Sequence, residues 1–265
     1  MTKSKYGDKI GLLILFLLIL FLLVQVGFVF IMSFSSGWTW PSIIPKELSV
    51  KGWKDVLLNR NSLDVIFVSL KIALIVSIIN LIVAIPAADA IARYDFKYKK
   101  TIEFFLLIPI VIPPIISTMG IHKTFIRINL TESILGVVLV HIIPTLPYMI
   151  RAIRISFENF GFEWEQQCQM LGSSKLDTFI NVKIFFLLPG IIAGSSLTIL
   201  ISFSQYITTI LIGGGQIQTL STNMVPYISS GEKTIGCVYA IIFAFICLST
   251  FGIMEYYLRR YYDSL

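Results

Sequence analysis

The chain has 265 residues, of which 56% are hydrophobic and 14% charged, and its formal net charge is +6. Soluble domains usually have about a quarter of their residues charged, so this composition excludes an ordinary water-soluble globular protein. The mean hydropathy is +0.84, and the apolar residues are grouped in long blocks. Together these features predict one membrane-embedded domain spanning residues 1–265.

A positive net charge can also indicate a nucleic-acid-binding surface. Here the basic residues stand in short strips between the apolar blocks, and the sequence has no lysine-rich face with interleaved aromatic residues. Membrane orientation explains these strips better than nucleic acid does. We therefore expect no nucleic-acid partner.

Six apolar blocks are long enough, or nearly so, to cross a bilayer, because about 20 helical residues span the hydrocarbon core. The blocks are 10–32, 65–91, 102–120, 134–150, 185–212 and 235–253. The fold class predicted is an all-α membrane protein with about six transmembrane helices. The first block could be mistaken for a signal peptide, but it exceeds the usual apolar core of roughly 7 to 15 residues, so we expect it to be retained.

The basic residues also favour one orientation. With the N-terminus inside, the predicted cytoplasmic segments contain thirteen lysines and arginines and the outside segments contain seven. Cytoplasmic loops carry an excess of these residues. We therefore predict a multi-pass protein with both termini in the cytoplasm.

Cofactor and metal chemistry have little support in the sequence. Cys168, Cys237 and Cys247 are odd in number and lack metal-ligand spacing, so we expect neither disulfides nor a metal site. The glycines at 213–215 are not followed by the Gly-Lys-Ser/Thr of a phosphate-binding loop. We expect no cofactor in this chain and no ATP hydrolysis by it.

The polar segment 151–183 predicts two short helices separated by a glycine. Residues 162–171 can form about three turns, and Gly172 supplies the left-handed residue that commonly ends a helix. Ser174 followed by Asp177 is typical of a helix start. Apolar residues then recur at helical spacing: Leu176, Phe179, Ile180 and Ile184. Periodicity alone leaves open an amphipathic connector lying on the membrane surface.

The same segment resembles the EAA loop of binding-protein-dependent ABC importer permeases, the MetI-like family. The residues that carry the resemblance are Glu165-Gln166-Gln167-Cys168, Leu171-Gly172, Val182 and Leu188-Pro189-Gly190. The family usually has Glu-Ala-Ala before the glycine. Here the aligned triplet is Gln166-Gln167-Cys168, and the acid stands one place earlier. The resemblance extends over most of the chain from Val65, through Ile85-Pro86-Ala87-Ala88, Leu107-Ile108-Pro109 and Pro113-Pro114.

This resemblance implies a MetI-like permease fold in the bacterial plasma membrane. The helix over 10–32 would be peripheral to a core over 65–257, and the loop 151–183 would contain a cytoplasmic coupling helix. Expected partners are ABC ATPase subunits that bind ATP and Mg²⁺, a second and different permease chain, an extracytoplasmic solute-binding protein and membrane lipid. The expected coupling residues are Phe162, Trp164, Glu165, Gln166, Gln167, Cys168, Leu171 and Gly172.

Further motifs look more like polyamine, thiamine, iron or phosphonate permeases than like sugar permeases. They are Leu130-Thr131-Glu132-Ser133, Gly136, His141, Leu146-Pro147-Tyr148, Gln205-Tyr206 and Ile212-Gly213-Gly214-Gly215. The implied function is ATP-driven import of a small polar or charged solute of one of these types.

Polar residues inside the fifth apolar block are candidates for the translocation path, because an unpartnered polar group within a bilayer is costly. They are Ser202, Ser204, Gln205, Tyr206, Thr208 and Thr209. Hydrogen bonding between helices is the alternative role for them. For His141 in the fourth block, a structural role is favoured over proton transfer, because no acidic partner is close in sequence.

Two rival functions remain. One is a stand-alone secondary transporter or a membrane assembly protein, which an inverted repeat would favour, although none is visible between the halves. A membrane-embedded enzyme is the other, and no paired carboxylates or metal-ligand cluster on a common span support it.

Overall fold

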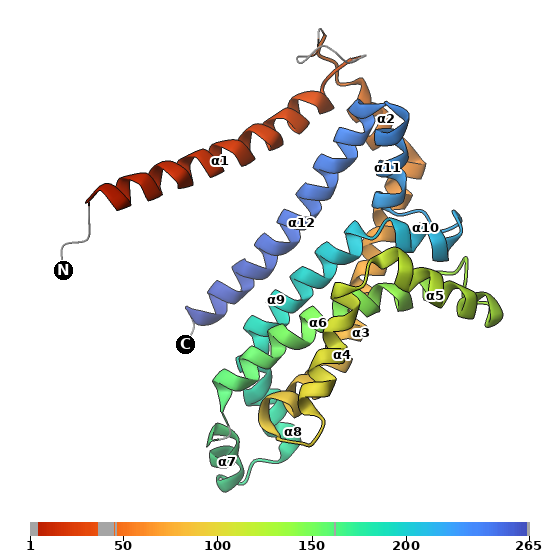
Figure 1. The fold of residues 1–265 in the computed structure, drawn as a ribbon. Coiled ribbons are helices and arrows are strands. Elements are labelled where there is room, and N and C mark those ends of the chain that lie inside the picture. The colour runs from red at the N-terminus through yellow and green to blue at the C-terminus, as the bar shows by residue number, and fades with distance from the viewer. Residues whose placement is uncertain (1–4, 37–44, 46, 162, 264–265) are drawn as a thin grey trace. The chain divides into compact units, whose positions relative to one another are not determined.

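The computed structural model describes residues 5–36, 45, 47–161 and 163–263 (Figure 1). Within these residues the regular structure is helical, with a single isolated bridge between Ser35 and Leu48. The chain divides into two compact units. The first comprises Met1–Leu63 with Met224–Ala244, and the second comprises Asp64–Asn223 with Phe245–Leu265.

Over the described residues, five helices are long and apolar enough to cross a membrane, and a sixth span results if one bent pair is counted. The prediction of about six spans in an all-α protein is thereby confirmed. The five single spans are Gly11–Ser33 within α1 (Lys5–Ser33), α3 (Arg60–Arg93), α6 (Ile134–Phe160), Lys175–Ser204, and Lys233–Arg260 within α12 (Lys233–Tyr262).

Two predicted spans are not continuous helices. The block 102–120 consists of α4 (Lys99–Val111) and α5 (Pro114–Arg127), which meet at an angle of 100°. The break falls at Pro113-Pro114, since neither residue has an amide hydrogen with which to continue the ladder.

The block 185–212 is likewise divided, into α9 (Ile184–Ser204) and α10 (Ile207–Gly213). Gln205 is extended, with ψ 91°, and its carbonyl oxygen accepts hydrogen bonds from the Thr209 and Ser221 hydroxyls. The predicted apolar block therefore contains a break, and side-chain hydroxyls supply the hydrogen bonds that make it possible.

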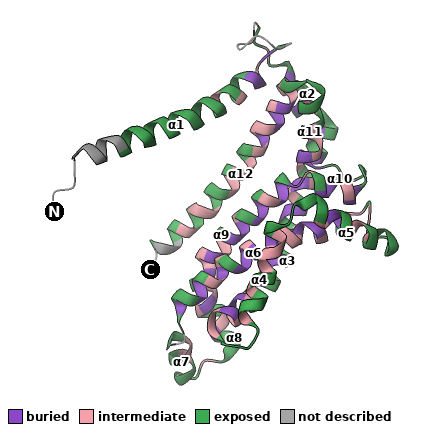
Figure 2. Cartoon of the chain, in the orientation of Figure 1, coloured by how far each residue is buried: buried purple, intermediate pink, exposed green. Residues whose placement is uncertain are grey.

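The first unit is joined by contacts near one end of α1. Trp53 of α2 (Lys51–Leu57) donates its indole N–H to Ser33 Oγ at 3.2 Å, and its ring stacks on Phe34. The Ser35 and Thr234 hydroxyls are 2.7 Å apart. Most of α1 is exposed along its length, as Figure 2 shows in green. An apolar helix exposed in this way is suited to lipid or to another membrane chain.

The second unit is centred on α3, α6 and α9. One apolar cluster joins all three of these helices, and another joins α3 and α6 to α10. Gly190 and Gly194, one turn apart on α9, let that helix approach α6 closely, since a β-carbon at either would lie within 2.6 Å of an α6 atom. Small residues at this spacing are the usual means of close helix packing in membranes.

At one end of the second unit, α6 leads into a short excursion before α9 begins (Figure 1). The excursion contains α7 (Glu163–Met170), α8 (Lys175–Thr178) and a π-helical turn, η1 (Phe179–Lys183). Later in the chain, α11 (Leu220–Ser230) follows α10. At the start of α11, the Leu220 amide donates a hydrogen bond to Ser69 Oγ of α3 at 2.7 Å.

Candidate functional site

The elbow between α7 and α8 has the helix, glycine, helix geometry that the sequence predicts. Gly172 has φ +85°, which favours glycine because a β-carbon would be strained there. The Gly172 amide donates to the Gln169 carbonyl and the Ser173 amide to the Cys168 carbonyl, each at 3.0 Å. These are the paired bonds of a Schellman helix end. The predicted turn is therefore confirmed.

The start of α8 is capped as predicted. Ser174 Oγ accepts from the Asp177 amide at 3.1 Å, which satisfies one of the free donors at the helix N-terminus. The following apolar residues do not continue an α-helix, however. They pass through the π-turn η1, which then runs directly into α9.

Apolar side chains around the elbow are turned outward. Met170 is 83% exposed and Leu171 is 88% exposed, and Leu176 and Ile180 beyond the elbow are exposed as well. We call Met170, Leu171, Leu176 and Ile180 the elbow surface. Leucine and methionine side chains that are this exposed are typical of a surface that a partner protein buries.

The other residues expected in coupling are placed differently. Trp164 is exposed on one face but stacks on Phe186 of α9, with ring centroids 6.2 Å apart. Gln166 and Gln167 are exposed and Cys168 is partly buried. Phe162 lies outside the described residues. Among the described apolar residues expected in coupling, Leu171 is therefore the most exposed.

Glu165 points toward the protein rather than away from it. Its Oε2 accepts a hydrogen bond from Arg93 Nη1, at the end of α3, and lies 2.8 Å from Lys183 Nζ in η1. Partial burial by itself raises the pKa of the Glu165 carboxyl. The contacts with Lys183 and Arg93 outweigh that effect and hold this pKa below its ordinary value of 4.5.

Arg93 is held on several sides. Its Nε lies 2.8 Å from Asp89 Oδ1 one turn earlier on α3, and its guanidinium lies over the rings of Phe157 and Phe160, with centroids 5.1 and 5.5 Å away. Only 5% of the Arg93 side chain is exposed. We call Asp89, Arg93, Glu165 and Lys183 the anchor cluster. Two carboxylates and two cations balance in charge, which favours ions that are partly buried.

The anchor cluster was not predicted from the sequence. In the sequence, Lys183 is one of the basic residues that mark orientation, and Arg93 also ends the segment that resembles the end of the family's first core helix. Glu165 is 72 residues from Arg93, and no pattern in the sequence links two positions so far apart.

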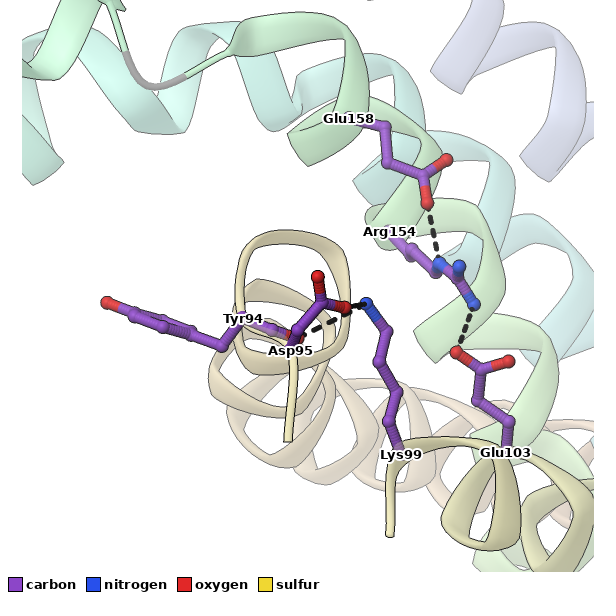
Figure 3. Close-up of polar contacts among 6 residues, drawn as sticks. All are labelled: Tyr94, Asp95, Lys99, Glu103, Arg154 and Glu158. Atoms are coloured by element: carbon purple, nitrogen blue, oxygen red, sulfur yellow. Dashed lines mark hydrogen bonds and ion pairs between the residues drawn. The ribbon is translucent and has the colours of Figure 1, made fainter. Parts of the chain in front are cut away.

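A second ion cluster lies near the same end of the unit and does not include α7. Arg154 of α6 lies between two carboxylates, with Nε 2.7 Å from Glu158 and Nη1 2.9 Å from Glu103 of α4 (Figure 3). Lys99 turns instead toward Asp95, at 3.3 Å, and the Tyr94 carbonyl. Arg154 therefore joins α4 to α6 independently of the elbow.

The six residues expected in the translocation path are divided among three settings. Ser202 and Ser204 end α9, Gln205 and Tyr206 form the break, and Thr208 and Thr209 begin α10. Ser204 is exposed and bonds back to its own helix at Ile201 O. The remaining hydroxyls and the amide are buried or nearly so. Hydrogen bonds among themselves or with His141 join Ser202, Gln205, Thr208 and Thr209 into one polar group, which includes neither Ser204 nor the partly buried Tyr206.

His141 lies at the centre of that buried polar group. Its Nδ1 and Nε2 each make a 2.9 Å hydrogen bond, to Ser202 Oγ and Thr209 Oγ1 respectively. The ring is 1% exposed. Both nitrogens are satisfied by hydroxyls, as expected of a structural histidine, and the histidine links α6 to both halves of the broken span.

A small cavity of about 30 Å³ lies where the two helix breaks come together. Its polar lining consists of Ser117 and Thr118 of α5 with Gln205 and Thr208, and the rest is made by prolines from α4, α5 and α6 and by aliphatic side chains of α5 and α6. Gln205 Oε1 accepts from Thr208 Oγ1 at 2.8 Å. The amide nitrogen is therefore the end of Gln205 that can donate to another molecule.

The described residues contain no group of three histidine, cysteine or acidic side chains that could hold a metal ion. Cys168, Cys237 and Cys247 are free thiols.

Comparison with known proteins gives the family. The family described as "Binding-protein-dependent transport system inner membrane component" matches residues 80–262, which is more than half of the chain. The chain belongs to this family. It is the permease subunit of an ABC importer, a multi-pass membrane protein whose ATPase is a separate subunit, and the resemblance in the EAA loop is confirmed.

Named relatives transport different solutes. The molybdenum transport system permease protein ModB of Haemophilus influenzae is 30% identical over 207 residues, covering 70% of this chain and 90% of the relative. The spermidine/putrescine permease PotB of Escherichia coli is 30% identical over 179 residues, covering 60% and 64%. A probable sulfate permease, cysT, of Helicosporidium is 26% identical over 196 residues, covering 68% and 73%.

Among solved structures, a bacterial ABC transporter involved in the import of the acidic polysaccharide alginate matches with a TM-score of 0.71. The match covers 97% of this chain and 99% of the other at 15% identity. At that identity the likeness shows the fold alone. It confirms the permease fold predicted from the sequence.

Proposed function

We propose that this permease transmits ATP-driven closure of a separate ATPase pair through the elbow between α7 and α8, and so passes a solute delivered by an extracytoplasmic binding protein. The observation that carries this proposal is the elbow surface, where Met170 and Leu171 are almost fully exposed beside a rigid helix end. A helix as short as α7 is marginal in water, so packing against a partner must supply most of its stability. A groove on an ATPase subunit would bury these side chains.

In this proposal ATP and Mg²⁺ bind to the ATPase subunits and not to this chain. The end of the bundle with α7 and α8 then faces the cytoplasm, and both termini lie on that side, in agreement with the distribution of basic residues. Single-cysteine variants at Asn159 and Asn129, tested with an impermeant thiol reagent in cysteine-free protein, should label from opposite sides of the membrane.

Retention of the ATPase on the elbow surface is the direct test. Leu171→Glu places a charge where an apolar anchor would be buried, so we expect co-purification of the ATPase subunits to fall roughly ten-fold or more. Gln169→Glu is the matched control, because it adds the same carboxylate to an exposed position two residues earlier, in the last turn of α7. Equal retention by both variants would remove the elbow from the ATPase interface.

A second permease chain completes the proposed path. Each copy of this chain offers one elbow, whereas a pair of ATPase subunits requires two. From the resemblance to polyamine-type permeases, we infer that the partner is a different chain. Native mass spectrometry of the purified complex would contradict this if it showed two copies of this chain and no other membrane subunit.

For the solute we favour a small oxyanion. The cavity at the helix breaks is lined by the Gln205 amide and the Ser117 hydroxyl, together with Thr118 and Thr208, whose hydroxyls donate within the protein. No carboxylate is among its lining residues. A polyamine cation would be better matched by carboxylates. Two of the named relatives transport molybdenum and sulfate, although a third transports spermidine and putrescine. Mass spectrometry of the ligand carried by the cognate binding protein decides this point, and a polyamine there would overturn the solute class but not the permease assignment.

A further inference from the structure

Glu165 joins three segments that are far apart in the sequence. Its carboxylate is shared by Arg93, at the last residue of α3, and by Lys183, at the last residue of η1 immediately before α9. Because α7 itself contains Glu165, one side chain ties the short helix to the ends of two long membrane-spanning helices.

The position of this acid on α7 differs from the family pattern. The aligned triplet begins at Gln166, which is exposed, whereas the acid stands one residue earlier. One residue turns the side-chain direction by roughly 100° around a helix. Glu165 is directed inward, to Arg93 and Lys183, and Gln166 places a neutral amide on the outward face.

Burial makes these contacts more effective than surface ion pairs. The side chains of Arg93, Lys183 and Glu165 are 5%, 11% and 17% exposed, so water and salt screen them little. Removing one member of such a group leaves an uncompensated buried charge, which is strongly unfavourable. The π-turn η1 carries Lys183, and π-turns in helices occur frequently at functional sites.

We infer that Glu165, Arg93 and Lys183 are positioning residues for energy coupling, through which a displacement of α7 is passed to α3 and α9. The ATPase contacts the elbow surface, and the anchor cluster connects the resulting movement of α7 to α3 and α9. This inference rests on the proposed function, since it assumes that the ATPase acts on the elbow.

The test uses the complete transporter reconstituted in lipid vesicles. For Glu165→Gln, Arg93→Gln and Lys183→Gln, three quantities are measured: ATPase subunits retained, ATP hydrolysed in the presence of binding protein, and solute imported per ATP. We expect the ATPase subunits to be retained while solute imported per ATP falls about five-fold or more, the lower range of measured allosteric couplings. Lys183→Arg keeps the charge and should retain most of the wild-type ratio.

Arg154→Gln and Glu103→Gln are the matched controls. They break an ion pair near the same end of the unit, also between helices, but without contact to α7 (Figure 3). Their import per ATP should stay near the wild-type value. An equal loss in these controls would show that any broken ion pair has this effect, and would overturn the inference.

A docking role for Glu165 has a different signature. If Glu165→Gln releases the ATPase subunits while Arg93→Gln and Lys183→Gln import normally, Glu165 contacts the ATPase and the inference is wrong. If Arg93→Gln fails to reach the membrane, the solute imported per ATP by Lys183→Gln and by Lys183→Arg still tests the inference. Failure of the proposed function is seen separately, as unchanged ATPase retention in Leu171→Glu.

Discussion

Gly190 of α9 lies so close to Ser156 of α6 that a β-carbon on the glycine would be 2.6 Å from Ser156 Oγ, and equally close to the Ala152 carbonyl oxygen. In an open helix, alanine is more stable than glycine by about 1 kcal/mol. Here we expect Gly190→Ala to destabilise the protein by roughly 1–3 kcal/mol, because α6 and α9 must separate. The measurement is thermal unfolding in detergent.

Gly252→Ala is the control for that prediction. Gly252 also lies inside a long helix, but a β-carbon there would meet nothing within 4 Å. Its melting temperature should be unchanged or slightly raised. If both variants behaved alike, the close approach of α6 and α9 would not determine stability.

At the elbow, Gly172→Val should reach the membrane yet lose its ATPase or fail to couple it to transport. At the positive φ of Gly172, a residue with a β-carbon would raise the conformational free energy by roughly 1–2 kcal/mol, and a β-branched residue by more. Space is not the obstacle, because nothing lies within 4 Å of the β-carbon position. Pull-down of the ATPase subunits and ATP hydrolysis stimulated by binding protein are the readouts.

Gly172→Asn separates the effect of backbone angle from that of side-chain size, since asparagine tolerates left-handed angles. We expect this variant to retain most of the coupling. Normal uptake by the valine variant would show that the segment is only a connector.

In the broken span, Gln205→Leu and Tyr206→Ala should reduce uptake while assembly and basal ATP hydrolysis remain. Gln205 presents its side chain to the cavity at the helix breaks, and leucine would remove the amide donor without emptying the site. Ser204→Ala is the neighbouring control, because that hydroxyl is exposed and bonds only within its own helix turn. Unchanged transport kinetics in both test variants would make the polar run structural.

His141→Leu tests the buried polar group. The substitution leaves the Ser202 hydroxyl without its imidazole partner, while the Thr209 hydroxyl keeps only its hydrogen bond to the Gln205 carbonyl. A buried polar group left unsatisfied costs about 1–3 kcal/mol. We expect a lower melting temperature and weaker protection of α10 in hydrogen exchange. His122→Leu, at a partly exposed position on α5, should have little effect.

Low pH should loosen the anchor cluster. Because the folded-state pKa of Glu165 is depressed, its contribution to stability is fully present above the ordinary value of 4.5 and is lost as pH falls through the lower folded-state value. We expect proteolysis or hydrogen exchange at α7 to increase as pH falls below about 4.5. Glu165→Gln should abolish this pH dependence. If the pH dependence persists in this variant, another titratable group causes it.

The sequence predicted local features well where one short segment contains the whole cause. Gly172 and the Ser174–Asp177 pair identify the elbow, since a positive φ and an N-cap depend on residues within a few positions. Most spans were found because a bilayer demands long apolar helices. The break at Gln205 was missed, because the hydroxyl of Ser221 that helps to stabilise it lies sixteen residues away.

By itself, therefore, the sequence determined a membrane permease with about six spans and a helix, glycine, helix loop, because hydropathy and backbone preference are local properties. The tertiary structure alone decided the direction of Glu165, placing it against Arg93 and Lys183 rather than outward. It also decided that His141 is satisfied by hydroxyls from both halves of the broken span. Partners so distant in the chain are brought together only by the packing of α3, α6 and α9, which no local pattern encodes.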